Sequence, residues 1–241
     1  MKKIAPFLFF ILSGLFILTS CIDILDNSVS GNGNVISEKR EVDSFDVIEV
    51  SSGLNVYAKF GEAGDELEVV ADENLQQYII TEVHGGRLKI RTERSIRHAR
   101  SKDIYVNAGS LRSIGVSSAA NLKGENRLVS GDLRIDVSSA GDLNLDLEAG
   151  RLDIEVSSSG DARLSGKVDK LRAETSSAGD LNAEDLEARS CEADASSAGD
   201  MDINVTGELS ASASSAGTIR YKGDPEIIRM SSSSAGSILK R

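Results

Sequence analysis

The chain has 241 residues, which is enough for one or two domains with a real hydrophobic core. Its 27 Lys and Arg face 38 Asp and Glu, and the resulting net charge of −11 argues against nucleic-acid binding, which needs a basic surface. With 2 His, 2 Cys and 4% aromatic residues, the composition excludes a zinc module, a disulfide scaffold and a polytopic membrane protein.

The N-terminus has the pattern of a secretory signal peptide over residues 1–20. Met1-Lys2-Lys3 is basic, and an apolar run follows from Ile4 to Leu18. Leu18-Thr19-Ser20-Cys21 then resembles the lipobox of bacterial lipoproteins, in which the Cys is lipidated and becomes the new N-terminus. We therefore expect a lipid on Cys21 to attach the protein to the membrane; a simple signal anchor is the alternative. No later stretch reaches the ~20 apolar residues that span a bilayer.

Residues 21–33 are predicted to be a flexible tether, because turn and linker residues predominate there. Removal of residues 1–20 takes away Lys2 and Lys3 and no acidic residue, so the charge falls from −11 to −13. We expect an outer-membrane lipoprotein, on either the cell-surface or the periplasmic face.

Residues 34–116 are predicted to be an irregular β cap. Short strands are expected at 45–51, 54–60, 67–71, 78–83, 88–92 and 103–107. The cap is expected to bury Phe45, Tyr57, Phe60 and Tyr78. The basic run from Arg94 to Arg100 is interpreted as a solvated loop, with contact to an anion or an envelope polymer as the alternative.

From residue 117 the chain repeats a short Ser-Ser segment, whose first Ser steps by 18 to 21 residues. Such a period indicates a solenoid. The copies are Ser117-Ser118-Ala119-Ala120-Asn121, Ser138-Ser139-Ala140-Gly141-Asp142, Ser157-Ser158-Ser159-Gly160-Asp161, Ser176-Ser177-Ala178-Gly179-Asp180, Ser196-Ser197-Ala198-Gly199-Asp200, Ser214-Ser215-Ala216-Gly217-Thr218 and Ser233-Ser234-Ala235-Gly236-Ser237.

Apolar residues alternate with polar residues on both sides of each Ser-Ser segment, which is typical of strands with one buried face. Two strands and two turns in about 19 residues make one coil, so residues 117–241 are predicted to form a single-stranded parallel β-helix, continuous with the cap as one domain over 34–241. Equivalent residues should form columns about 4.8 Å apart. One predicted column is Leu122, Leu143, Ala162, Leu181, Met201, Ile219 and Ile238, and another is Val116, Val137, Val156, Thr175, Ala195 and Ala213.

The turn residues carry two structural hypotheses. The glycines are expected to supply a positive φ; they are Gly141, Gly160, Gly179, Gly199, Gly217 and Gly236. The aspartates should stack into a ladder; they are Asp142, Asp161, Asp180 and Asp200. Each Asp is expected to bond the turn backbone; the alternative is a Ca²⁺ site, because hard cations take oxygen ligands. No other cofactor is expected.

Catalysis is not expected. Some β-helices cleave acidic polysaccharides with Asp-bound Ca²⁺ and an Arg base, and Arg134, Arg151, Arg163 and Arg172 are available. The loops, however, are short, and Tyr221 is the only aromatic residue from 117 onward. Cys191 occupies the column of Leu133, Leu152, Leu171 and Leu209, so we interpret it as a buried apolar filler.

Several segments together resemble one family. They are Phe45-Asp46-Val47-Ile48-Glu49-Val50, Leu54-Asn55-Val56, Val69-Val70-Ala71-Asp72-Glu73-Asn74-Leu75, Thr81-Glu82-Val83, Arg87-Leu88-Lys89-Ile90, Leu111-Arg112-Ser113-Ile114 and the Ser-Ser-Ala-Gly-Asp turns. Over roughly 34–237 the chain resembles the putative auto-transporter adhesins with a head GIN domain, a domain of unknown function found in Bacteroidetes lipoproteins. The resemblance implies a right-handed parallel β-helix and no established biochemical activity.

The expected function is therefore non-catalytic adhesion, binding or structural support in the cell envelope, with an unidentified protein or glycan as ligand. Ca²⁺-dependent glycan binding or polysaccharide processing is the alternative, and an accessory role in envelope maintenance is a third.

Overall fold

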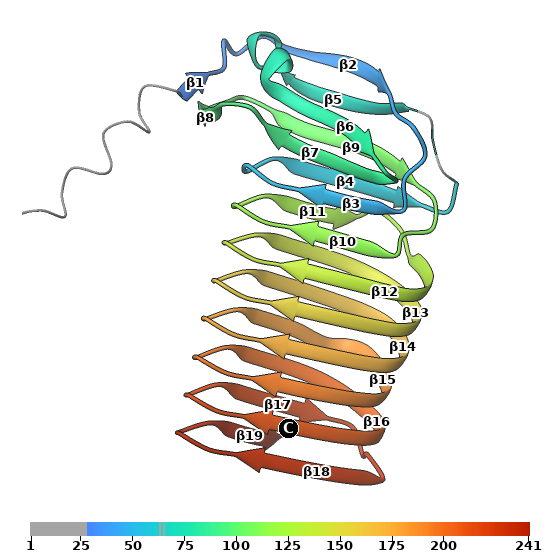
Figure 1. Cartoon of the computed structure of the whole chain (residues 1–241), viewed down its shortest axis with the longest axis vertical. Helices are drawn as coiled ribbons and strands as arrows, with labels where there is room; N and C mark the ends of the chain where they lie inside the picture. Colours follow the sequence, from blue (N-terminus) through green and yellow to red (C-terminus); the bar gives the residue numbers. More distant parts are fainter. Residues whose placement is uncertain (1–27, 63, 65) are drawn as a thin grey trace, which may run out of the picture.

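The computed structural model describes residues 28–62, 64 and 66–241; the predicted signal peptide and Cys21 lie outside them. The strands stack into a solenoid with a cap at its N-terminal end, so the predicted parallel β-helix is confirmed (Figure 1). Seventeen strands share one hydrogen-bonded sheet, and β1 (Ser28–Ser30) pairs separately with β8 (Ser95–His98). In the described part of the chain, no helix is long and apolar enough to cross a membrane.

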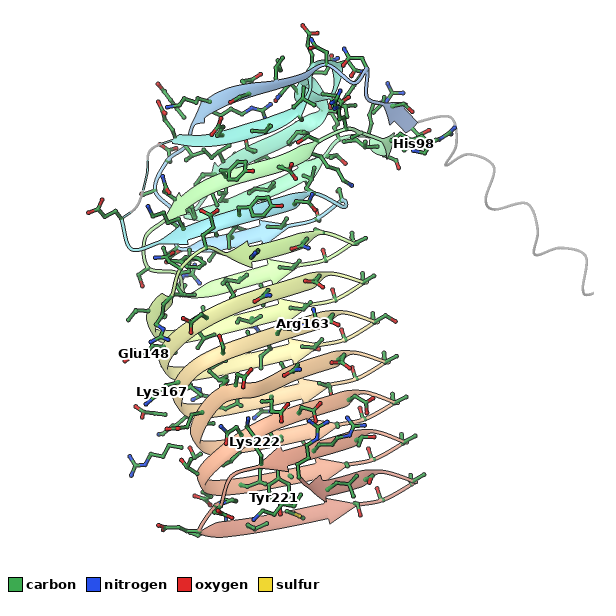
Figure 2. All side chains as sticks on the ribbon, turned by 180° about the vertical axis from the view of Figure 1, so that it is seen from behind. His98, Glu148, Arg163, Lys167, Tyr221 and Lys222 are labelled. Atoms are coloured by element: carbon green, nitrogen blue, oxygen red, sulfur yellow. The ribbon has the colours of Figure 1, made fainter. Side chains whose placement is uncertain are left out.

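Each Ser-Ser turn is preceded by a length of strand that leads into it and followed by one that leads out of it. The strands of the repeat region are β10 (Ser113–Val116), β11 (Asn121–Gly124), β12 (Leu128–Val137), β13 (Asp142–Val156), β14 (Asp161–Thr175), β15 (Asp180–Ala195), β16 (Asp200–Ala213), β17 (Thr218–Lys222), β18 (Ile227–Ser232) and β19 (Ser237–Lys240). The strands leading into the turns face the viewer in Figure 1, and those leading out, which carry Arg163 and Lys222, face the viewer in Figure 2. The chain between them winds right-handedly from the cap to the last coil.

In the middle coils the expected second turn is instead a bend inside a continuous strand, whereas a short non-strand segment separates β11 from β12 and β17 from β18. β13, β14, β15 and β16 each run unbroken from one Ser-Ser turn to the next. Pairing continues through the bend, as Glu148 with Lys167 and Arg151 with Lys170 show. Because a parallel neighbour follows most of the bend, with local register shifts between β14, β15 and β16, most of the backbone stays hydrogen-bonded and no hairpin is needed. Figure 2 labels Glu148 and Lys167 at this bend edge, opposite the turn edge.

Both predicted core columns are confirmed by the pairing register. The first column pairs Leu122 with Leu143 and continues to Ile238; the second pairs Val116 with Val137 and continues to Ala213. Aliphatic side chains therefore fill a flat two-sided core, and the second column narrows from Val to Ala toward the C-terminus.

The positive φ of each turn belongs to the residues before the glycine, so that expectation is wrong. In the turn from Ser138 to Gly141, Ser139 and Ala140 have φ of 52° and 59°, and the Gly141 N–H donates to the Ser138 carbonyl at 2.9 Å. This is the pattern of a type I′ turn. The left-handed conformation costs a non-glycine residue about 1–2 kcal/mol. It lets the Ala140 N–H donate to the Ser158 carbonyl of the next coil at 3.1 Å.

The turn glycines are needed for close approach between coils. A Cβ placed on Gly199 would lie 2.8 Å from the carbonyl oxygen of Thr175 in the preceding coil, and one on Gly141 would lie 2.7 Å from that of Val116. Such distances are shorter than any real Cβ contact. The glycine thus permits tight stacking in the six turns from Ser138 onward, whereas the turn at Ser117 has Ala120 in its place.

The cap contains one more coil of the same kind. β3 (Val47–Val50) and β4 (Asn55–Phe60) are joined by a Ser-Ser turn in which Ser52 and Gly53 both have φ of 65°. This coil pairs in parallel with β10 and β11, and the Gly53 N–H donates to Ser118 at 2.9 Å. The copy of the turn at Ser51-Ser52 was not predicted from the sequence.

The remaining cap strands lie where the sequence predicts them, within two residues. They are β5 (Glu66–Asp72), β6 (Ile79–His84), β7 (Arg87–Thr92) and β9 (Lys102–Ala108), with a 3₁₀ helix at Glu73–Tyr78 and an unpredicted β2 (Val35–Glu41). β2 pairs with β5 and β5 with β9, both antiparallel, and together they close the end of the solenoid (Figure 1).

Only one of the four aromatic residues expected to be buried in the cap is fully buried. Phe60 is 5% exposed, whereas Phe45, Tyr57 and Tyr78 are half-buried. Tyr57 alternates with the inward residues of β4, so its ring points outward. It stacks on Tyr105, with ring centroids 5.0 Å apart.

Part of the expected tether and of the expected basic loop is regular structure. β1 pairs in parallel with β8, so residues 28–30 and 95–98 form a short ribbon. The buried carboxylate of Asp72 accepts hydrogen bonds from the N–H groups of Gly33 at 2.5 Å, Arg100 at 2.7 Å and Ser101 at 3.2 Å. Burial raises the pKa of Asp72, but these donors outweigh it and hold the pKa below its usual value. The carboxylate thus fastens both segments to β5.

The last coil leaves apolar side chains exposed at the end of the core. Ile227, Ile228 and Met230 of β18 and Leu239 of β19 are 43–51% exposed. Ion pairs hold this coil to the body: Lys240 contacts Asp224 at 2.7 Å, and Arg241 contacts Asp202 at 3.1 Å.

Close stacking at the turn predicts that Gly199→Ala destabilises the protein by at least about 2 kcal/mol, because the new Cβ overlaps the Thr175 carbonyl. Urea denaturation measures the change. Gly131→Ala is the matched control. A Cβ there meets nothing within 4 Å, and alanine is more favourable than glycine inside a strand. Equal stability of the two variants would contradict this account of the turn.

Candidate binding face

The sheet formed by the strands leading into the turns carries an ordered set of charges on its outer surface. Alternate residues point outward, and equivalent positions of successive coils stack into columns. One column alternates in sign: Arg134, Asp153, Arg172 and Glu192. The next column toward the turns is acidic throughout: Asp136, Glu155, Glu174 and Asp194.

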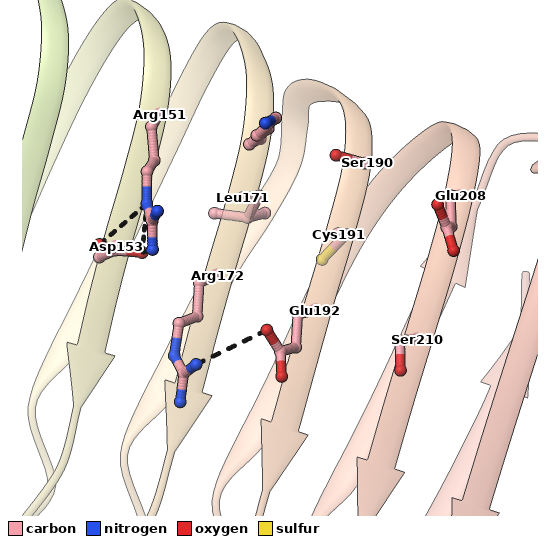
Figure 3. A pocket seen from close by; sticks show the side chains of 10 residues that line it. Arg151, Asp153, Leu171, Arg172, Ser190, Cys191, Glu192, Glu208 and Ser210 are labelled. Atoms are coloured by element: carbon pink, nitrogen blue, oxygen red, sulfur yellow. Dashed lines mark hydrogen bonds and ion pairs between the residues drawn. The ribbon is translucent and has the colours of Figure 1, made fainter.

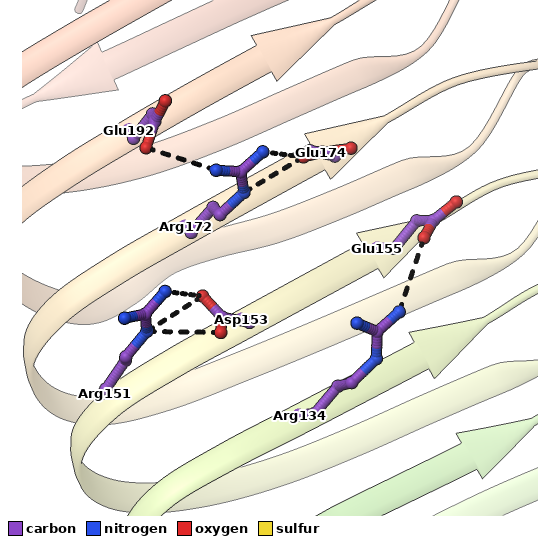
Figure 4. A network of polar contacts seen from close by, with 7 residues as sticks. All are labelled: Arg134, Arg151, Asp153, Glu155, Arg172, Glu174 and Glu192. Atoms are coloured by element: carbon purple, nitrogen blue, oxygen red, sulfur yellow. Dashed lines mark hydrogen bonds and ion pairs between the residues drawn. The ribbon is translucent and has the colours of Figure 1, made fainter.

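Arginines of the alternating column bridge to the acidic column (Figure 4). Arg134 contacts Asp136 at 3.0 Å and Glu155 at 3.9 Å. Arg172 contacts Glu174 at 2.6 Å and Glu192 of the next coil at 3.6 Å. Exposed pairs of this kind contribute little stability, at most about 1 kcal/mol each. Their effect is to fix the position of each guanidinium.

These contacts also raise the pKa of both arginines. The hydrogen bond to Glu174, followed by the charges of Glu192 and Glu174, raises the pKa of Arg172. The hydrogen bond to Asp136 raises the pKa of Arg134 in the same way. Asp194 differs, because burial, followed by the charge of Glu192, raises the pKa of its carboxyl group.

A hollow of about 300 Å³ opens in this face (Figure 3). It forms where the column of Arg151 and Lys170 changes to Ser190, because a short side chain replaces long ones. Its lining joins cations, acids, hydroxyl groups and two apolar side chains: Arg151, Asp153, Lys170, Leu171, Arg172, Ser190, Cys191, Glu192, Glu208 and Ser210. Such a site can hold a polar ligand with one apolar surface.

Cys191 lies at the base of this hollow, and its predicted burial is confirmed. It pairs with Leu171 on one side and Leu209 on the other, and it is 4% exposed. Burial, reinforced by Glu192 and Asp194, raises the pKa of its thiol to about 12. A thiol of this kind is unreactive at neutral pH.

The Asp ladder lies on the opposite sheet, in the predicted register. The carboxylates of Asp142, Asp161 and Asp200 meet arginines rather than the turn backbone, so the expectation of backbone bonding is wrong. Arg163 contacts Asp142 at 3.5 Å and Asp161 at 3.0 Å, and Arg220 contacts Asp200 at 3.9 Å. Figure 2 shows Arg163 on this face.

The ladder offers no ligand set for Ca²⁺. Within residues 28–62, 64 and 66–241, no three His, Cys, Asp or Glu side chains are grouped to hold a metal ion. One column supplies one carboxylate per coil, whereas Ca²⁺ takes six to eight oxygens. In the middle of the ladder, burial and the charges of Asp161 and Asp200 raise the pKa of Asp180.

Sequence reasoning named neither the hollow nor the outward Tyr57–Tyr105 pair. Arg151 and Arg172 of the hollow were identified from the sequence, but only as isolated residues. The pairing register of β13 to β16 would have placed Lys170 beside Ser190 and shown the change in side-chain length. The tyrosines come from β4 and β9, which pair across 48 residues of chain, and no local pattern reveals that contact.

Comparisons with known proteins agree on the fold. The family model described as "Putative auto-transporter adhesin, head GIN domain" matches residues 44–225. A putative adhesin from Bacteroides fragilis superimposes with a TM-score of 0.82 at 23% identity, covering 88% of this chain and 100% of the other. A putative adhesin from Parabacteroides merdae gives 0.74 at 22% identity, covering 89% and 99%.

A third solved structure is named a putative lipid binding protein, from Parabacteroides distasonis. It gives a TM-score of 0.70 at 24% identity, covering 89% of this chain and 99% of the other. No curated protein matches the chain.

The raised pKa of Asp180 predicts that Asp180→Asn stabilises the protein slightly at pH 7. Relative to the unfolded chain, the folded protein favours the protonated form of Asp180. The stability that this preference contributes is fully present below the unfolded pKa near 3.8 and is lost as pH rises through the folded pKa. Because the side chain is exposed, we expect a gain of ~0.5 kcal/mol or less. Urea denaturation at pH 7 and pH 3 measures it, and the gain should vanish at pH 3. Asp142→Asn, which breaks an ion pair with Arg163, should give no gain at pH 7.

Proposed function

The chain belongs to the family described as "Putative auto-transporter adhesin, head GIN domain", and on that premise we propose that it is a non-catalytic adhesion module of the cell envelope. The hollow beside Arg172 carries this proposal. A rigid sheet presents fixed charges at steps of about 4.8 Å, which suits recognition of an extended ligand.

The ligand that fits the hollow best is a glycan. Sugar hydroxyl groups can donate to Glu192 and Glu208 and accept from Arg172, and such bonds to charged groups are the stronger ones. Leu171 offers an apolar surface at the base for the carbon face of a ring. The neighbouring hydroxyl groups of Ser190 and Ser210 add further partners.

Polysaccharide cleavage is the second candidate, because the pKa of one carboxyl group on this face is raised, which is the direction that a general acid needs. Asp194 combines a raised pKa with a position two residues from Glu192. Asp153 and Glu174, by contrast, form ion pairs with Arg151 at 3.2 Å and Arg172 at 2.6 Å, so neither is placed as a free acid. We therefore favour binding without turnover.

The module is proposed to be anchored in the outer membrane through a lipid on Cys21. The lipobox-like Leu18-Thr19-Ser20-Cys21 supports this. β1 belongs to the cap, at the opposite end of the solenoid from β19 (Figure 1). An anchor at Cys21 would thus place the cap next to the membrane and the binding face farther out.

Glycan binding predicts that Arg172→Ala lowers affinity more than tenfold, because charged hydrogen bonds are lost. A glycan array followed by titration of the best glycan measures the effect. Arg163→Ala, on the opposite sheet, is the control and should bind as the native protein does. An assay for new reducing ends accompanies the titration. Release of sugar that Asp194→Asn abolishes would establish the enzyme instead, and equal affinity of both Arg variants would rule out the hollow.

Lipid anchoring predicts that Cys21→Ala leaves the precursor without lipid and moves the protein from the membrane to the soluble fraction. Metabolic labelling with a fatty acid and carbonate washing of membranes measure this, with Cys191→Ala as the matched control. Protease treatment of intact cells reports the exposed face. Membrane retention of the Cys21 variant after washing would show that the anchor lies elsewhere.

A further inference from the structure

The ribbon of β1 and β8 stands where the coil of β7 and β9 should have its short turn. β7 ends at Thr92 and β9 begins at Lys102, so nine residues replace the Ser-Ser turn found in the other coils. Within that insertion β8 pairs in parallel with β1, Ser28 opposite Ser95 and Val29 opposite Ile96. The ribbon thus lies at the cap end of the turn edge (Figure 1).

The ribbon is basic in a protein that is otherwise acidic. The nine inserted residues, 93–101, hold three arginines, one histidine and a single acidic residue, Glu93, and Lys102 follows them, while the whole chain has a net charge of −11. Arg97, His98 and Arg100 are exposed, and Figure 2 labels His98 at this position. Such a cluster creates a local positive potential against a negative background.

The cations are also held in place. The Arg97 guanidinium donates to the Ser28 hydroxyl at 2.9 Å, and that of Arg94 lies 5.4 Å from the centre of the Tyr78 ring. The backbone N–H of Arg100 donates to the Asp72 carboxylate at 2.7 Å, which fixes the chain at this arginine. Fixed cations lose little conformational freedom when they bind an anionic surface.

The position of the ribbon along the chain brings it near the proposed anchor. Ser28 follows Cys21 by seven residue steps, so the chain between them spans at most about 25 Å. The acidic body is repelled by anionic lipids, and the repulsion is screened over about 8 Å at physiological ionic strength. The ribbon is then the part of the protein that can approach such a surface most closely.

We propose that the β1–β8 ribbon binds the phosphate groups of anionic lipids in the membrane that carries the anchor, and so sets the orientation of the solenoid. This rests on the proposed lipid anchor for its cellular setting. The binding itself depends only on the ribbon, and it should weaken as salt rises.

Vesicle cosedimentation tests the ribbon. The chain from residue 22 onward, which has no lipid, is mixed with vesicles of phosphatidylcholine alone or of equal parts phosphatidylcholine and phosphatidylglycerol, at low and physiological salt. We expect binding to the phosphatidylglycerol vesicles only, weakened by salt, and lowered more than tenfold by Arg97→Gln/Arg100→Gln. The corresponding lysine variant should keep most of the binding, because the charge remains.

Lys123→Gln/Lys167→Gln is the matched control: it removes the same charge from exposed positions on the solenoid body, outside the hollow, and should bind as the native chain does. Thermal melting confirms that each variant is folded. Equal binding to both vesicle types, or equal loss in the two glutamine variants, would overturn the proposal. Since this protein carries no lipid, either result is separate from the outcome for Cys21→Ala in cells.

Discussion

The close stacking of one Ser-Ser turn on the next is the contact on which the rest of the solenoid depends. Gly199 lies against the Thr175 carbonyl of the coil before, and the Ala198 N–H donates to the Ser215 carbonyl of the coil after at 3.0 Å. These contacts fix the register of the strands on both sides of the turn. The left-handed conformation of Ser197 and Ala198 is the conformational cost of pointing an N–H along the solenoid axis.

Register in turn decides what the outer surface can do. Side chains fall into columns only because every coil has the same phase relative to its turn. Arg172 can reach both Glu174 of its own coil and Glu192 of the next for that reason. The hollow exists because a single column changes from Lys170 to Ser190 between two coils. A shift of one residue would move these charges into the core.

Features encoded by local pattern were predictable, and features that depend on contact between distant segments were not. The spacing of the Ser-Ser segments and the alternation around them predicted the coil, both core columns and the burial of Cys191. The role of the turn glycines was misread because their constraint comes from the neighbouring coil, which a φ-based argument ignores. The turn at Ser51-Ser52 was missed because Leu54 replaces the glycine and more than sixty residues separate it from Ser117. β8 was missed because β1 and β8 are only three and four residues long and hold one apolar residue each, Val29 and Ile96, which is too little to show a period.

The exclusive contact of each turn with its two neighbours also bears on how such a protein can change length over evolution. Duplication of one repeat would insert one more coil, about 4.8 Å thick, whose two hydrogen-bonding edges already match those of its neighbours. The match is best between coils of similar core width, such as those of Val137 and Val156, and poorer where Thr175 gives way to Ala195. A change in the number of repeats would thus alter the length of the solenoid beyond the cap without any change in the turn or the cap.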